Sequence, residues 1–324
     1  MMRSTTGTRT IRNELLPLLR NQEPELRGNQ RVWKLTVSDT WYQHPSQIDC
    51  YNHLTSNPSY ALRMHGAEEK CFSENKMGLQ KLLPKRFSLV DLGPGDGTHT
   101  FTLMKAADLI QRISYYYPTD ISDEELRNAV STAGDNHVPV VVPIKRNFMT
   151  ELDNVVARVS QNRNEPSLYN LGATLVNFDR DVMLTLLRDS VQAQDFIYVS
   201  AQLVGRNAAE IEVQYCQDGT TRVVAEVMKS LGFEGSDFIL QVEYDYPTKE
   251  IWISATLSRI PGSVRANGKG LSKLHEGDKV VVLRSYKPRL LEFEELVGKY
   301  FDGMVFTDKE ETYAGFIGTP RKVA

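Results

Sequence analysis

Three glycines, Gly93, Gly95 and Gly97, follow directly on the short apolar run 87–92 (FSLVDL), and helical spacing of apolar residues begins after them. Glycines at the carboxyl end of a strand allow a sharp turn. They also let a ligand reach bare backbone, where the free N–H groups of the next helix point. This order of strand, glycine turn and helix predicts a site for a nucleotide-like ligand. The alternative is a turn that only connects two elements.

Two carboxylates accompany the glycine turn. Asp91 lies in the strand itself, and Asp120 closes the next apolar run, 113–118 (ISYYYP). A carboxylate at the end of this second strand is well placed to accept hydrogen bonds from two ribose hydroxyls. Because Ser122 follows closely, Asp120 could instead cap a helix. The glycine spacing, G-x-G-x-G, lacks the continuation that a pyrophosphate site prefers, which favours S-adenosylmethionine over a dinucleotide.

The elements that position these residues alternate between strand and helix. Further apolar runs at 138–144, 168–177 and 196–203 are predicted as strands, and a helix is predicted at 179–188. Such alternation is typical of a mainly parallel sheet with helices on both faces. After Gly205 the pattern changes to a helical stretch, 208–231, interrupted near Gly219. An antiparallel hairpin, 238–246 and 250–260, and a strand, 279–286, follow it.

The composition places the chain among ordinary globular proteins. Its 38 basic and 41 acidic side chains give a net charge of -3, so we expect no nucleic-acid partner. No apolar run is long enough for a membrane span, and we expect a cytoplasmic protein that binds a small molecule. The three cysteines are too scattered for a disulfide framework, and the six histidines lack metal-ligand spacing, so no metal site is expected. A homodimer is left open.

The stretches VDLGPGDG and YYYPTDIS resemble the first two motifs of class I S-adenosylmethionine methyltransferases, in particular those of the histidine-specific methyltransferase family. The best-known member of that family trimethylates the α-amine of histidine on the way to ergothioneine. LYNLGATLVNF, AAEIEVQYCQDG and VVVLRSYKPRLLEFEEL are also similar, so the resemblance runs from residue 87 to the C-terminus. It implies substrate contacts at Asn177, Tyr215 and Ser285. The cofactor-binding residues expected from these motifs are Asp91, Gly93, Gly95, Gly97, Asp120, Asn147 and Phe148.

Two departures from the family pattern bear on specificity. Where the histidine methyltransferases carry a glutamate that recognises the imidazole, two residues before the serine, this chain has Leu283. An adenine-contacting aspartate of the family is replaced by Asn147, which still offers a hydrogen bond to an adenine edge. The resemblance therefore implies that cofactor binding is kept and that histidine specificity is lost.

Together these features predict an α/β protein with a Rossmann-like class I methyltransferase sheet and a second, smaller substrate-binding domain. We expect a core at 87–204 that is completed by 286–324, a substrate-binding insertion at 205–285, and a segment, 1–86, that contributes to the substrate domain. The expected activity is N-methylation of a free amino acid with S-adenosylmethionine, with the guanidinium of arginine favoured. The alternatives are histidine α-N-methylation and a non-catalytic cofactor-binding regulator.

Overall fold

The computed structural model describes residues 11–35, 50, 53–54, 57–162, 164–205, 208–217, 219–262, 264 and 271–321. The chain divides into two compact units. Unit 1 comprises 1–57 and 207–285, and unit 2 comprises 58–206 and 286–324. Residues 58–86, expected to contribute to the substrate domain, cluster with unit 2. The reason is that the helix at 67–74 packs on the helix that follows the glycine turn and on the last strand of the chain.

Unit 2 is built on an eight-stranded sheet in the described part of the chain. Its order is β12-β13-β8-β7-β3-β4-β5, and β6 pairs with β4 beside β5. The strands β3 to β8 run parallel where they pair, and β13 is antiparallel to both β8 and β12. The strand bounds are β3 Phe87–Leu92, β4 Ile113–Asp120, β5 Val140–Val141, β6 Ile144–Lys145, β7 Ser167–Gly172, β8 Phe196–Gln202, β12 Phe301–Thr307 and β13 Tyr313–Pro320. This sheet confirms the predicted α/β, Rossmann-like core.

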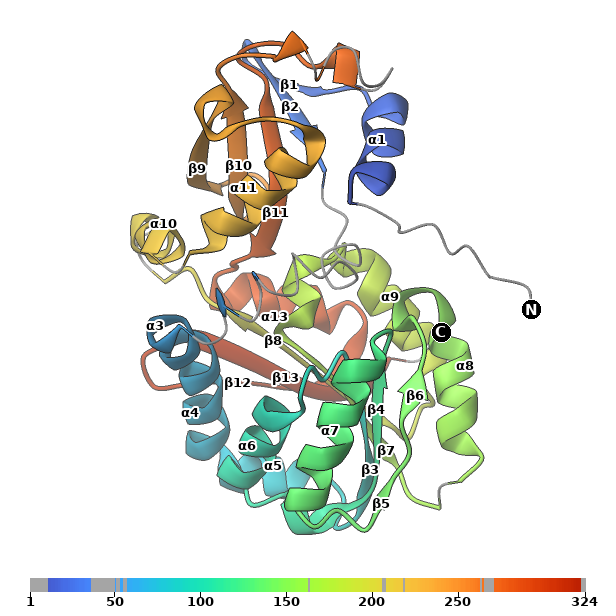
Figure 1. The fold of residues 1–324 in the computed structure, drawn as a ribbon. Helices are drawn as coiled ribbons and strands as arrows, with labels where there is room; N and C mark the ends of the chain where they lie inside the picture. The colour runs from blue at the N-terminus through green and yellow to red at the C-terminus, as the bar shows by residue number, and fades with distance from the viewer. Residues whose placement is uncertain are drawn as a thin grey trace, which may run out of the picture. The chain divides into compact units, whose positions relative to one another are not determined.

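Helices cover both faces of this sheet, so that unit 2 has three layers. The helices α4 Ala67–Glu74, α5 Lys76–Leu82, α6 Thr98–Ala106 and α7 Asp123–Asp135 share one hydrophobic cluster, and α6 and α7 lie in front of the strands in Figure 1. The helices α8 Phe148–Ser160, α9 Arg180–Ser190 and α13 Leu290–Gly298 share the other cluster. A short helix α3, Pro58–Ala61, and a π-helical turn, Leu62–Gly66, precede α4.

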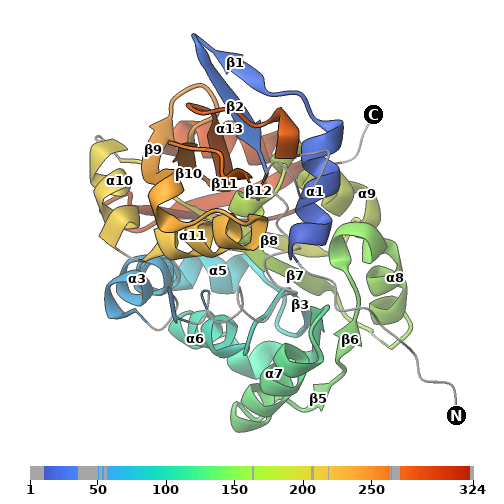
Figure 2. The same ribbon diagram turned by 45° about the horizontal axis from the view of Figure 1, so that its top comes forward.

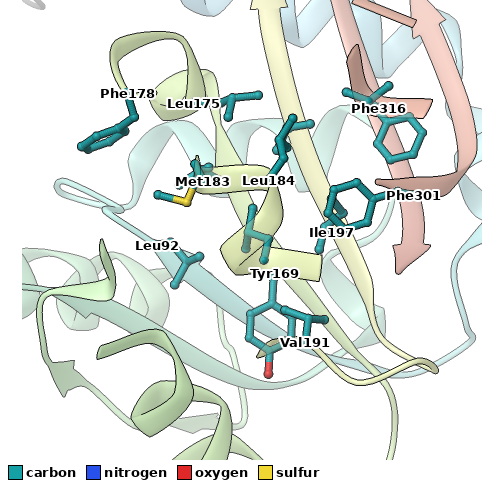
Figure 3. Packing of buried hydrophobic residues seen from close by; sticks show 14 of the residues in the cluster. Leu92, Tyr169, Leu175, Phe178, Met183, Leu184, Val191, Ile197, Phe301 and Phe316 are labelled. Atoms are coloured by element: carbon teal, nitrogen blue, oxygen red, sulfur yellow. The ribbon is translucent and has the colours of Figure 1, made fainter. Parts of the chain in front are cut away.

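Alternate side chains of the central strands supply the two clusters. Leu89 packs with the α6 layer and its neighbour Val90 with the α8 layer. Tyr198 and Ile197 of β8 divide in the same way, as expected for side chains that alternate across a sheet. Figure 3 shows the second cluster, in which Leu92 and Ile197 lie near Met183 and Leu184 of α9. All six residues of β3 are buried, as in a strand covered on both faces, and four of the six are apolar.

Two predicted strands differ from the observed ones. The run 168–177 is not one strand, because β7 ends at Gly172, whose φ of +49° departs from extended geometry, and Ala173–Asn177 then forms a 3-10 helix. The run 138–144 is divided into β5 and β6. Pro143 lies between them, and proline cannot donate to the ladder of hydrogen bonds.

Unit 1 contains a five-stranded sheet of order β1-β2-β11-β10-β9. Its strands are β1 Glu25–Arg27, β2 Gln30–Lys34, β9 Phe238–Asp245, β10 Glu250–Leu257 and β11 Lys279–Tyr286. The predicted hairpin is confirmed, since β9 and β10 pair antiparallel from Phe238↔Leu257 to Asp245↔Glu250. The α-helices described in this unit, shown in Figure 2, are α1 Ile11–Asn21, α10 Ala208–Gln217 and α11 Thr220–Leu231. Helix α11 packs against β9 and β10.

Candidate functional site

The glycine turn follows β3 at the point where the strand order of the unit 2 sheet reverses. The next strands, β4 and β5, lie on one side of β3, and the later strands, β7 and β8, lie on the other. Ligands of open α/β sheets bind at such a point, beyond the carboxyl ends of the strands. Gly93, Gly95 and Gly97 have φ values of +75°, +56° and +75°, a region that other residues rarely adopt. A Cβ at Gly95 would meet no atom within 4 Å, so the backbone there is open to a ligand.

Asp91 forms the centre of a buried polar cluster beside this turn. Its carboxylate accepts hydrogen bonds from Tyr116 Oη at 2.9 Å and from Asn170 Nδ2 at 2.8 Å, while Thr100 Oγ1 lies 3.1 Å from the same amide nitrogen. Burial raises the pKa of Asp91 to about 6, although these hydrogen bonds act in the opposite direction. A group that brings positive charge would therefore favour the ionised form of Asp91.

Asn170 offers the clearest sign that a polar ligand belongs here. Its Oδ1 atom is buried and has no hydrogen-bond partner within the described ranges. Buried acceptors are normally paired, and an unpaired one costs about 1–3 kcal/mol. Together with the open backbone at Gly95 and the carboxylates Asp91 and Asp120, this acceptor fits the polar groups of S-adenosylmethionine.

Asp120 stands at the carboxyl end of β4, outside the following helix. Its Oδ1 accepts from the backbone N–H of Ser122 at 2.8 Å, and Ser122 in turn caps α7 by accepting from the N–H of Glu125. The cap is therefore Ser122 rather than Asp120. Burial raises the pKa of Asp120. This carboxylate lies at the strand end where a ribose contact is expected.

Asn147 and Phe148 meet the same end of the sheet from the start of α8. Asn147 caps α8 through its side-chain oxygen, which accepts from the N–H of Met149 at 3.0 Å. Its NH₂ group is therefore the part that an adenine acceptor would use. The ring of Phe148 lies over the turn, with Cε1 3.5 Å from the position of a Cβ on Gly93, and packs edge-on against Phe178. It offers an apolar surface to a flat ring.

The residues expected to bind the substrate lie in different parts of the chain. Asn177 is the last residue of the 3-10 helix in unit 2, not the end of a strand. Tyr215 is a buried residue of α10, and Ser285 is buried near the end of β11, both in unit 1. Leu283 and Ser285 share one face of β11 because side chains alternate along a strand. Arg284 takes the other face, 3.7 Å from the carboxylate of Glu250.

A second buried cluster in unit 2 was missed in the sequence. Glu68 of α4 is 2% exposed, and its Oε2 lies 2.6 Å from Nε2 of His99, in the first turn of α6. The other oxygen, Oε1, accepts from Ser200 Oγ at 2.7 Å and from Tyr198 Oη. His99 could be noticed because it follows the glycine turn, but no spacing in the sequence links it to Glu68.

The described ranges bear on two expected absences, that of a metal site and that of a membrane span. There, no three histidine, cysteine, aspartate or glutamate side chains gather in a way that could hold a metal ion. No helix in the same part of the chain combines the length and the apolar character that crossing a membrane requires.

Comparisons with known proteins identify the chain at the level of a family. The model of a family described as histidine-specific methyltransferase, SAM-dependent, matches residues 35–317. This match begins well before residue 87, where the visible resemblance of the motifs starts. No curated protein sequence matches the chain.

Three solved structures are similar at low identity. The PH0226 protein from Pyrococcus horikoshii OT3 is 14% identical, with a TM-score of 0.45 over 82% of this chain and 94% of that one. The CcbJ methyltransferase from Streptomyces caelestis is 11% identical, with a TM-score of 0.38 over 78% and 90%. The plantazolicin methyltransferase BpumL in complex with SAH is also 11% identical, with a TM-score of 0.38 over 88% and 95%. The fold therefore rests on the strand order described above.

Proposed function

The chain belongs to the histidine-specific, S-adenosylmethionine-dependent methyltransferase family, and we propose that within this family it methylates a nitrogen of a free amino acid other than histidine. The cofactor is S-adenosylmethionine and the protein is a methyltransferase. The proposal concerns the acceptor, which the family description alone would make histidine. It rests on one observation, the identity of residue 283.

Leu283 carries the argument against histidine. It shares a face of β11 with Ser285, where the family resemblance expects a glutamate that pairs with the imidazole. A leucine side chain has no atom that accepts a hydrogen bond from a ring N–H. An unpaired buried donor costs about 1–3 kcal/mol, so a site with Leu283 should discriminate against histidine by about 10- to 100-fold.

The α-amino and α-carboxylate groups common to all amino acids have their own proposed anchors. Asn177, Tyr215 and Ser285 supply an amide and two hydroxyls, which can both donate to a carboxylate and accept from an amine. When bound, S-adenosylmethionine supplies a methyl group on a sulfonium, which a nitrogen lone pair can attack in line. The proposed task of each of these side chains is to bind the amino acid so that its acceptor nitrogen lies in that line.

Arginine is the first alternative acceptor to test, but the carboxylates that could pair with its guanidinium are largely engaged. Glu243 pairs with Lys279 at 2.7 Å, and Glu68 is held by His99. Glu212 accepts from the backbone N–H of Tyr244. An amino acid with a neutral or apolar side chain therefore deserves equal weight beside arginine.

The proposal is tested by incubating the protein with S-adenosylmethionine and each free amino acid in turn, followed by mass spectrometry. We expect a product heavier by methyl-group increments from at least one amino acid other than histidine, with S-adenosylhomocysteine formed in step. Histidine as the best acceptor would support the family's usual activity instead. Cofactor binding without any product would support the regulatory alternative. The matched control is the Asn177→Ala variant, which should bind cofactor and form no product.

A further inference from the structure

The buried ion pair Glu68–His99 takes no part in the methyl transfer described above. Glu68 is 2% exposed, whereas the side chain of His99 is 27% exposed and so lies between the interior and solvent. A buried carboxylate without a cationic partner would be strongly unfavourable. The pair is therefore either structural or connected with what binds at the nearby turn.

Glu68 is fixed from several elements at once. In addition to His99 of α6, its carboxylate is bound by Tyr198 and Ser200 of β8, and Ser200 Oγ lies 3.2 Å from Tyr313 Oη of β13. Burial alone would raise the pKa of Glu68, but the charge of His99 and these hydrogen bonds lower it below the usual value. Glu68 is thus an ionised group whose position is set by the sheet.

The pair borders the cofactor turn on two sides. His99 stands two residues after Gly97, in the first turn of α6. Glu68 Oε1 is 3.9 Å from the place of a Cβ on Gly172, at the end of β7 next to Asn170. The ion pair therefore links the start of α6 to the strand end that carries the unpaired Asn170 oxygen.

The charged and titratable groups around His99 decide its protonation. Burial lowers its pKa, but Glu68, and to a lesser extent Asp91 and Glu69, outweigh burial and raise it. The ring of His65 stacks on His99 at 4.2 Å between centroids, and burial together with the charge of His99 lowers the pKa of His65 to about 4. The charge of Asp96 in the turn acts in the opposite direction and raises the pKa of His65. These shifts favour the charged form of His99 and the neutral form of His65.

We propose that Glu68 is a positioning residue of the cofactor site, which pairs with His99 and fixes its imidazole at the start of α6 so that S-adenosylmethionine binds tightly. The anionic group of this cofactor is its α-carboxylate, and a fixed positive charge beside the free N–H groups of a helix start favours an anion. When His99 loses its proton, Glu68 becomes an uncompensated buried charge, and the site turns more negative toward that carboxylate.

The sign of the pH dependence follows from this arrangement. His99 is charged below its raised pKa, and the charge is lost as the pH rises through that value. Affinity for S-adenosylmethionine should therefore fall as the pH rises through the raised pKa of His99. An affinity that rises with pH would contradict the proposal, because it would show that the overall cationic charge of the cofactor dominates its binding.

The test is calorimetric titration of the whole protein with S-adenosylmethionine, in the absence of any acceptor, from about pH 6 to about pH 9. Glu68→Gln should weaken binding at neutral pH by about 10- to 100-fold, the range for a hydrogen bond between charged groups. Glu69→Gln is the matched control: it removes the same charge from the exposed neighbour and should change binding far less. Because no acceptor is present, the outcome is independent of the proposed amino-acid substrate.

Two variants of His99 keep the proposal decidable if Glu68→Gln does not fold. His99→Gln should bind weakly at all these pH values. His99→Lys keeps a positive charge up to about pH 10 and should restore binding without the alkaline decline. A wild-type affinity that does not fall with pH, an equal loss in Glu69→Gln, or a loss in His99→Gln that His99→Lys does not restore would overturn the proposal.

Discussion

Asn170 donates its side-chain amide to the carboxylate of Asp91 across the neighbouring strands β7 and β3, at 2.8 Å. This contact turns the carbonyl oxygen of Asn170 away from Asp91 and leaves it unpaired in the described part of the chain. The donor and acceptor functions of one amide are thereby separated. The donor side completes the protein's own cluster, and the acceptor side is left without a partner in the described ranges.

Asp91 should make the affinity for S-adenosylmethionine depend on pH in the acidic range. Burial raises its pKa to about 6 in the free protein, and a cationic ligand favours its ionised form. Affinity for S-adenosylmethionine should therefore increase as the pH rises through about 6, and Asp91→Asn should lack this increase. Calorimetric titration at several pH values measures it. If the affinity of wild type and variant changed equally with pH, the pH dependence would belong to another group.

The pKa shift of Asp91 also affects stability. A group whose folded pKa is raised contributes stability that is fully present below its unfolded value, 3.8, and is lost as the pH rises through about 6. His65, whose pKa is lowered to about 4, acts oppositely: its contribution is present above 6.5 and is lost as the pH falls toward 4. The thermal unfolding temperature of Asp91→Asn should therefore rise relative to that of wild type between pH 4 and pH 7. A relative loss over that range would contradict the sign.

Gly95→Val should abolish cofactor binding and leave the fold intact. The φ of +56° strains any side chain by about 1–2 kcal/mol, and the valine would occupy the open approach to the turn. Gly277→Val is the matched control, since Gly277 also has a left-handed φ, +84°, and open space around it. Both variants should lose similar stability in thermal unfolding, but only Gly95→Val should lose binding in calorimetry.

Asp120→Ala should weaken cofactor binding by about 10- to 100-fold, because ribose hydroxyls would lose their acceptor. The cap of α7 is Ser122, so the helix should persist in the variant. Glu124→Ala, which removes an exposed carboxylate from the same segment, is the control. Equal affinity of Asp120→Ala and wild type would remove Asp120 from the site.

Leu283→Glu should increase kcat/KM for histidine by about tenfold or more, since the new carboxylate can accept from an imidazole N–H. Leu283→Met keeps an apolar side chain of similar size and should leave histidine turnover low. Steady-state kinetics with both variants separate the chemistry of the side chain from its volume. No gain for Leu283→Glu would mean that residue 283 does not meet the acceptor side chain.

The cofactor half of the candidate site could be proposed from the sequence because the residues expected to form it are local. Gly93, Gly95 and Asp91 lie within one strand and turn, and a short apolar run identifies the strand that carries them. Asp120 needed only the next strand. Two interpretations of Asp120 could not be separated in the sequence, because the side chain that caps α7 is decided by backbone geometry.

Glu68, Tyr198 and Ser200 could not be predicted, because they meet only when α4 packs against β8. Nothing in the spacing of a glutamate and a serine more than a hundred residues apart indicates a shared hydrogen bond. Asn177 was recognised by resemblance, but its place at the end of a 3-10 helix depends on Gly172, whose left-handed φ is not apparent from an apolar run. Which unit residues 58–86 join depends likewise on packing.

The most direct test of the central claim is the ratio of kcat/KM for histidine to that of the best other amino acid, measured in the wild-type protein with saturating S-adenosylmethionine. Leu283 cannot pair an imidazole N–H, so the ratio should be about one tenth or lower. A ratio above one, with histidine as the best acceptor, would contradict the account.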